Sequence, residues 1–116
     1  MRLGEVCLFT SDVIRLADFY KWLLGAENDS NDSVHQFILT EETSLTVYID
    51  GNLRGANTQH IGIAFTVADV HAEYERLTAR GVTVISHPTV RPWGATNMSF
   101  LDPDGNLVTV RSLAKA

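Results

Sequence analysis

The chain has little cysteine, little positive charge and no long apolar run, and each shortage excludes a class of protein. Its 116 residues include one cysteine, Cys7, so neither an internal disulfide nor a CxxC metal pair can form. Nine basic residues against 14 acidic ones give a net charge of −5, without the basic cluster that nucleic-acid phosphates require. No apolar run reaches the roughly 20 residues of a membrane span. We expect neither a nucleic-acid partner nor a membrane.

The N-terminal residues predict the compartment. Met1–Glu5 runs directly into a strand-like pattern and lacks the apolar stretch of a secretory signal. A single cysteine also suits a reducing environment. These features predict a cytoplasmic protein, and the length predicts a single domain spanning residues 1–116.

A repeated pattern divides this domain into two modules. One strand-like stretch ends in Ser-Asp at Asp12, and a second ends in Ala-Asp at Asp69, 57 positions later. After each aspartate, apolar residues recur at helical spacing. Aspartate is a favourable N-cap, and Gly25 and Gly81 can end the helices in the left-handed conformation. Each half therefore begins as a strand followed by a helix.

Strand patterns follow each helix. The predicted strands are a short one within 27–33, about 36–40 and 45–50 in the first half, and 82–86, about 95–101 and 107–111 in the second. The sequence thus predicts an α+β fold of two tandem β-α-β-β-β modules, about 3–50 and about 60–112, joined by a linker at 51–59. An apolar helix covers one face of each sheet. The other faces are expected to form a curved mixed sheet, a cup, with the helices on its outer face.

Alternation along the strands predicts which residues face the cup, because successive side chains point to opposite faces. The apolar sets, such as Val6 with Leu8 and Val108 with Val110, suit the helix side. The opposite sets are expected in the cup: Glu5, Cys7 and Phe9; Thr46, Tyr48 and Asp50; His60, Gly62, Ala64 and Thr66; Leu107, Thr109 and Arg111.

The motif Asp102-Pro-Asp-Gly-Asn106 predicts a tight hairpin between two apolar strands. Trp93-Gly94 precedes it, and the first helix carries Phe19-Tyr20 and ends in Leu24-Gly25. Together with the strand-Asp-helix opening, these motifs resemble the vicinal oxygen chelate superfamily, which includes glyoxalases, bleomycin-resistance proteins and extradiol dioxygenases. The resemblance runs from about Gly4 to Arg111. It implies the paired-module fold and, in a chain of this length, a homodimer.

The resemblance also implies four positions at which metal-dependent members place histidine or glutamate. Here they fall on Glu5, Tyr48 (or Asp50), Gly62 and Thr109. Only Glu5 is a good ligand for a divalent ion, so no cofactor is expected. The alternative is an atypical site for Zn, Ni, Fe or Mn that combines Glu5 with His60.

Metal-free members bind drugs in cups lined with aromatic rings, because flat rings stack on aromatic and cationic groups. The chain is accordingly expected to bind a small aromatic or polar molecule in a metal-free cup, as in antibiotic sequestration. The candidate ligand-binding residues are Glu5, Phe9, Phe37, Tyr48, His60, Trp93, Met98 and Arg111. Trp93 could instead be a core or dimer-interface residue, and Glu5 could pair with Arg111.

Two other functions stay open. One is a metal-dependent lyase, isomerase or dioxygenase with an unusual ligand set, acting through Lewis-acid chemistry. The other is an interaction module whose cup is filled by its own side chains. Catalysis is the less favoured reading, because three of the four ligand positions lack a strong donor.

Overall fold

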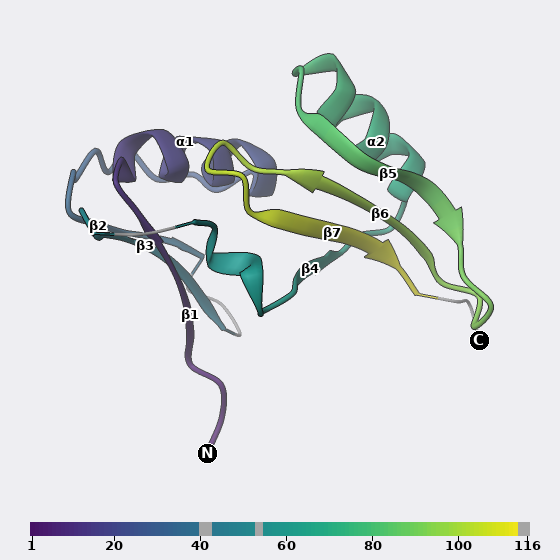
Figure 1. Ribbon diagram of the computed structural model, residues 1–116, viewed down its shortest axis with the longest axis horizontal. Helices are drawn as coiled ribbons and strands as arrows, with labels where there is room; N and C mark the ends of the chain where they lie inside the picture. The colour runs from purple at the N-terminus through teal and green to yellow at the C-terminus, as the bar shows by residue number, and fades with distance from the viewer. Residues whose placement is uncertain (40–42, 53–54, 114–116) are drawn as a thin grey trace. The chain divides into compact units, whose positions relative to one another are not determined.

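The computed structural model describes residues 1–39, 43–52 and 55–113 and contains two helices and seven strands in this part of the chain (Figure 1). In chain order the elements are β1 (Glu5–Thr10), α1 (Val13–Leu24), β2 (His35–Leu39), β3 (Ser44–Ile49), the 3₁₀ turn η1 (Asn57–Gln59), β4 (Ile63–Thr66), α2 (Val70–Ala79), β5 (Thr83–Val90), β6 (Thr96–Leu101) and β7 (Leu107–Ser112). None of the helices in these ranges is long and apolar enough to span a bilayer.

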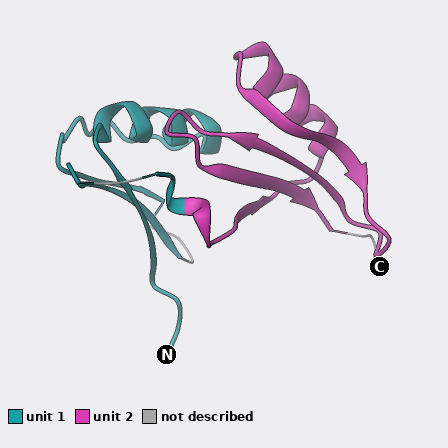
Figure 2. Cartoon of the chain, in the orientation of Figure 1, with its two compact units in different colours: residues 1–57 teal, residues 58–116 magenta. Residues whose placement is uncertain are grey.

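The chain divides into two compact units, residues 1–57 and 58–116 (Figure 2). The first contains a three-stranded sheet in the order β1-β3-β2, and the second a four-stranded sheet in the order β4-β7-β6-β5. In the first sheet β1 pairs in parallel with β3, and in the second β4 pairs in parallel with β7. The other strand pairs are antiparallel. Both sheets are therefore mixed, and one helix packs on each. The predicted α+β fold and its internal repeat are confirmed.

The short strand predicted within 27–33 does not form. Side chains rather than a backbone ladder link this segment to β2: the Asn28 amide donates to the Phe37 carbonyl at 2.8 Å, and the Gln36 amide donates to the Asp32 carbonyl at 3.0 Å. Asn28 Oδ1 also accepts from the Ser30 N–H. Asn, Asp and Ser favour such local bonds over strand pairing. The first unit consequently has one strand fewer than the second.

The helix boundaries follow the predicted caps. The Asp12 carboxylate accepts from the Arg15 N–H, and the Asp69 carboxylate accepts from the Ala72 N–H, both at 3.2 Å. Gly25 ends α1 in the left-handed region, at φ 62°. The second helix is capped one residue earlier, at Arg80, and Gly81 follows at φ 82°. These local interactions explain why both helices could be predicted from sequence.

One face of each sheet is buried under its helix. In the first unit, Leu8 and Val47 are no more than 1% exposed, and α1 contributes the fully buried Tyr20. In the second unit, Val108 and Phe100 face each other across β7 and β6, both at 0% exposure. The helix-side sets agree with the predicted alternation. The opposite faces of the two sheets therefore carry the exposed side chains.

Asp32 fixes the entry into β2 and gives a prediction about pH. Its Oδ1 accepts from the N–H groups of Val34 at 2.7 Å and His35 at 3.1 Å. These bonds, that to Val34 above all, lower the pKa of the Asp32 carboxyl, and the nearby His35 lowers it further. Since the folded pKa lies below the unfolded value of about 3.9, the stabilisation is complete above that value and is lost as the pH falls through the folded pKa.

We expect the Asp32 carboxyl to titrate below the ordinary aspartate pKa in an NMR titration of the intact chain. Over the same acid range the amide exchange of Val34 and His35 should accelerate. Asp32→Asn keeps an acceptor oxygen without the charge, so it should remove the acid dependence at these two amides. A midpoint at or above the ordinary value would contradict the assignment.

Candidate functional site

The open face of the first sheet carries an aromatic surface, here called the aromatic face. Strand register builds it in rows: Phe9 on β1 lies opposite Tyr48 on β3, which lies opposite His35 on β2. In the adjacent row Thr46 lies between Cys7 and Phe37. Phe9, Tyr48 and Phe37 keep 42%, 42% and 51% of their surface exposed. Large aromatic side chains normally bury most of their surface, so this face is unusual for a sheet.

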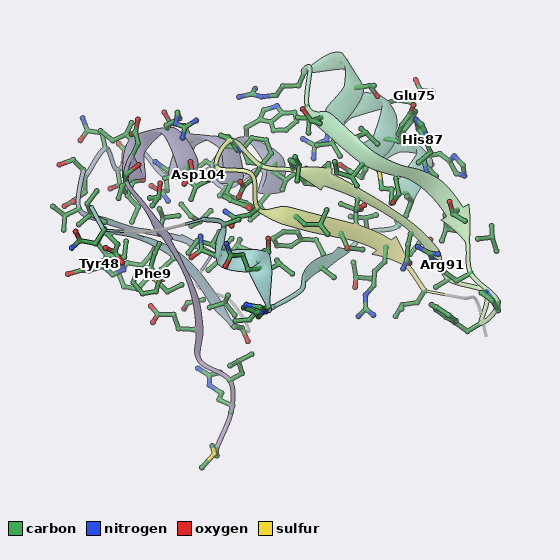
Figure 3. All side chains as sticks on the ribbon, in the orientation of Figure 1. Phe9, Tyr48, Glu75, His87, Arg91 and Asp104 are labelled. Carbon is green, nitrogen blue, oxygen red and sulfur yellow. The ribbon has the colours of Figure 1, made fainter. Side chains whose placement is uncertain are left out.

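The rings of the aromatic face contact one another in sequence. Ring centroids are 6.5 Å apart for Phe9 and Tyr48, 5.1 Å for Tyr48 and His35, and 4.7 Å for His35 and Phe37. The Phe9–Tyr48 pair is edge-to-face, and the other two are tilted. Phe9 and Tyr48 lie together on the same side of the sheet (Figure 3). Each ring restricts its neighbour, so the face presents ordered aromatic area to solvent.

Glu5 lies on the same face at the start of β1, and its side chain is hydrogen-bonded to a residue of β3. The Thr46 hydroxyl donates to Glu5 Oε2 at 3.1 Å. Tyr48 pairs with Phe9 instead, four residues along from Glu5, which is roughly 13 Å on an extended strand. Tyr48, to which the second of the four family positions was assigned, therefore does not adjoin Glu5 on β3. The alternative, Asp50, follows β3 and accepts from the Asn52 N–H in a turn.

Asn57 supports the aromatic face and was missed from the sequence. Its Oδ1 accepts from the Phe9 N–H and its amide donates to the Phe9 carbonyl, both at 2.9 Å. The side chain thus pairs with the free edge of β1 as a strand residue would, at the residue that carries the first ring. It lies in the predicted linker, where an asparagine 48 residues from its partner gives no local signal. Residues 53 and 54 of that linker lie outside the described residues.

The open face of the second sheet is polar around Arg111, and Leu107 and Leu101 form an apolar row at one end of it. Thr66 and Asn97 flank Arg111 in register, and the Arg111 Nε donates to Thr66 Oγ1 at 3.1 Å. Arg111 and Thr109 therefore lie on the face that the alternation predicts. Met98 does not. It pairs with Val110 on the helix side of the sheet and is 0% exposed, so its placement in the cup was wrong.

Two further candidates lie outside both open faces. His60 was predicted to face the cup from the strand of the second module, but β4 begins at Ile63, and His60 lies in an exposed bend after η1. Trp93 lies in the turn between β5 and β6 and is 69% exposed, so it is not a core residue. Both belong to the second unit, whereas the aromatic face belongs wholly to the first.

The donor set does not fit a resident metal ion. Among the described residues, no three His, Cys, Asp or Glu side chains come together in a way that could hold one. At the family's ligand positions the structure offers the Glu5 carboxylate next to the Thr46 hydroxyl, and Thr109 opposite Ala64. Neutral hydroxyls are weak ligands for the divalent ions of interest. We therefore derive no chemical step through a metal.

These features define an α+β protein of two related units, each with a helix on one face of a mixed sheet and the other face open. Residues 2–110 match the Glyoxalase/Bleomycin resistance protein/Dioxygenase superfamily, and the chain belongs to this superfamily. The membership inferred from the hairpin and strand-Asp-helix motifs is thus confirmed. No curated protein matches the chain.

Solved structures agree with this assignment. A glyoxalase/bleomycin resistance protein/dioxygenase family enzyme from Burkholderia phytofirmans PsJN is similar at 17% identity and a TM-score of 0.81, covering 97% of this chain and 99% of that one. A superfamily member from Sphaerobacter thermophilus DSM 20745 is 26% identical, with a TM-score of 0.76 and 97% of each chain covered. A lactoylglutathione lyase from Agrobacterium tumefaciens is 22% identical, with a TM-score of 0.73 and 94% and 91% covered. Identities of 17–26% establish the fold here, and function has to be argued from the site.

Proposed function

We propose that the protein binds a small planar aromatic compound on the aromatic face, without chemical conversion. The observation that carries this proposal is the run of four contacting rings from Phe9 to Phe37, three of them at least 42% exposed. A flat ligand laid on such a surface gains contact area at little entropic cost, because neighbouring rings already restrict one another. This support concerns the first unit alone.

Glu5 indicates the charge of the ligand. Its carboxylate is exposed on this face and forms no ion pair within the described part of the chain. A cation placed over the rings would be attracted both by their π faces and by this carboxylate. The net charge of −5 would also draw cations toward the protein. We therefore propose an aromatic cation as the ligand class, and sequestration of an antibiotic of that kind as one biological use.

Two other functions receive less support. A metal-dependent lyase, isomerase or dioxygenase would require a metal site, and a lone carboxylate beside a hydroxyl offers a poor one. An interaction module filled by its own side chains would cover the aromatic rings, yet Phe37 remains 51% exposed. Neither alternative is favoured by a specific observation.

The test is an NMR titration of the full chain with N-methylquinolinium, a planar aromatic cation. We expect saturable shifts of the ring and backbone resonances of Phe9, Phe37 and Tyr48. Neutral quinoline should bind several-fold more weakly, and tetramethylammonium, which has no ring, more weakly still. Glu5→Gln keeps the size of the side chain and an acceptor for Thr46, and should reduce the preference for the cation over quinoline.

Two results would overturn the proposal. One is the absence of saturable shifts on the aromatic face with any of the three compounds. The other is tetramethylammonium binding as tightly as N-methylquinolinium, which would show that the rings contribute nothing to recognition.

A further inference from the structure

The two units share their architecture but differ in the chemistry of their open faces. The first presents rings and a carboxylate. Around Arg111 the second presents mostly short polar side chains and a guanidinium, in two rows across β4, β7 and β6, beside an apolar row of Leu107 and Leu101. These rows consist of Ala64, Thr109 and Ser99, and of Thr66, Arg111 and Asn97. The open face of the first sheet therefore carries a negative side chain and that of the second a positive one. This difference indicates a second kind of ligand.

Arg111 is held in place for binding. Its Nε donates to Thr66 Oγ1 at 3.1 Å, which directs the guanidinium along the sheet face. The side chain is exposed and forms no ion pair in the ranges that the structure describes. Arginine usually pairs with carboxylates in folded proteins through two parallel N–H donors. In an acidic chain, an arginine without a carboxylate partner is available to an anion from solution.

Asn97 adds a second observation. It lies directly opposite Arg111 in the antiparallel pair of β6 and β7. Its Oδ1 is buried and has no hydrogen-bond donor among the described residues. A buried carbonyl oxygen without a donor is unfavourable, so rotation of this amide toward a ligand that supplies a donor would be stabilising.

We propose that the open face of the second sheet binds a small carboxylate that also carries a hydrogen-bond donor next to the carboxyl group, such as a hydroxy acid. Arg111 takes the carboxylate through its terminal N–H groups. Asn97 accepts the hydrogen bond from the neighbouring donor, and Thr66 positions the guanidinium. This proposal does not depend on the one made for the aromatic face.

Glycolate, acetate and inorganic phosphate are the probes, titrated into the full chain and followed by NMR. We expect saturable shifts at Thr66, Asn97 and Thr109 and at the Arg111 Nε–H, with glycolate binding several-fold more tightly than acetate. Arg111→Gln should weaken glycolate binding about tenfold, the usual effect of losing one charged hydrogen-bonding partner. Asn97→Ala should lower the affinity for glycolate to the level of that for acetate.

Arg80→Gln is the matched control, because it removes the same charge from the C-cap of α2 and should leave glycolate binding unchanged. Equal losses in the Arg80 and Arg111 variants would show only a general effect of charge and would overturn the proposal. Tighter binding of phosphate than of glycolate would overturn the assignment to a carboxylate. Retention of N-methylquinolinium binding in Arg111→Gln would show that the variant is folded.

Discussion

Asp102→Ala is expected to lower the free energy of unfolding by about 3–4 kcal/mol, the largest effect on stability that we predict for a polar residue of this chain. Asp102 is 5% exposed and begins the turn between β6 and β7. Its Oδ1 accepts from the N–H groups of Asp104 and Asn106, both at 2.9 Å, and its Oδ2 accepts from the Asn106 amide at 2.8 Å. One carboxylate thus organises the whole turn.

The size of this effect follows from burial. Asn106 is 0% exposed, so truncation of Asp102 would remove the carboxylate acceptor of its N–H and amide while both groups remain buried. Each such group costs about 1–3 kcal/mol, and part of that cost is relieved when water enters the new space. Against a typical total stability of about 5–15 kcal/mol, the loss is severe.

Thermal unfolding of the variant should occur roughly 15–25 °C below that of the wild type, given a shift of about 4–8 °C per kcal/mol for a domain of this size. Asp104→Ala is the control, because it removes the same charge from the same turn while these three acceptor interactions remain. Equal destabilisation by the two substitutions would contradict the special role of Asp102. Amide exchange along β6 and β7 would show whether the loss is centred on the hairpin.

Tyr48→Ala is expected to weaken N-methylquinolinium binding about thirtyfold. Tyr48 is the central ring of the aromatic face, with Phe9 at 6.5 Å on one side and His35 at 5.1 Å on the other. Its removal takes away one π face and also leaves both neighbours less restricted. We assign about 2 kcal/mol to these effects together, from the usual strengths of aromatic pairs and cation–π contacts, and this corresponds to the thirtyfold change.

The fold should survive this substitution, because 42% of the Tyr48 surface is exposed and the core lies on the other side of the sheet. Isothermal titration calorimetry on the folded variant measures the change in affinity. Trp93→Ala is the control: it truncates an even larger aromatic side chain in the second unit and should leave the affinity unchanged. A loss in the Trp93 variant similar to that in the Tyr48 variant would contradict the assignment of the site to the aromatic face.

The parts of this protein that could be predicted from sequence depend on neighbours in the chain. The caps at Asp12 and Asp69 and the turn at Asp102–Asn106 bind backbone groups within four residues. Strand alternation also needs only local sequence, so Glu5, Phe9 and Arg111 were placed on the correct faces. Burial against a helix forces this alternation, since a shift of one residue would expose the apolar set.

Features that depend on distant residues could not be predicted in this way. Met98 is an exception: alternation with the polar Asn97 and Ser99 already placed it beside Phe100 on the helix side, and its assignment to the cup overlooked this local pattern. His60 was given to a strand whose start is set by pairing with β7.

Sequence by itself determined the family, the two helices, the final hairpin and the faces of β1 and β7. Each of these is encoded by local capping, turn chemistry or period-two burial. Tertiary structure alone decided that Thr46 rather than Tyr48 adjoins Glu5 and that Asn57 pairs with the edge of β1 at Phe9. It also decided that four rings meet on a single open face. The physical reason is that register between strands is a long-range property, fixed by the packing of the whole sheet rather than by any one segment.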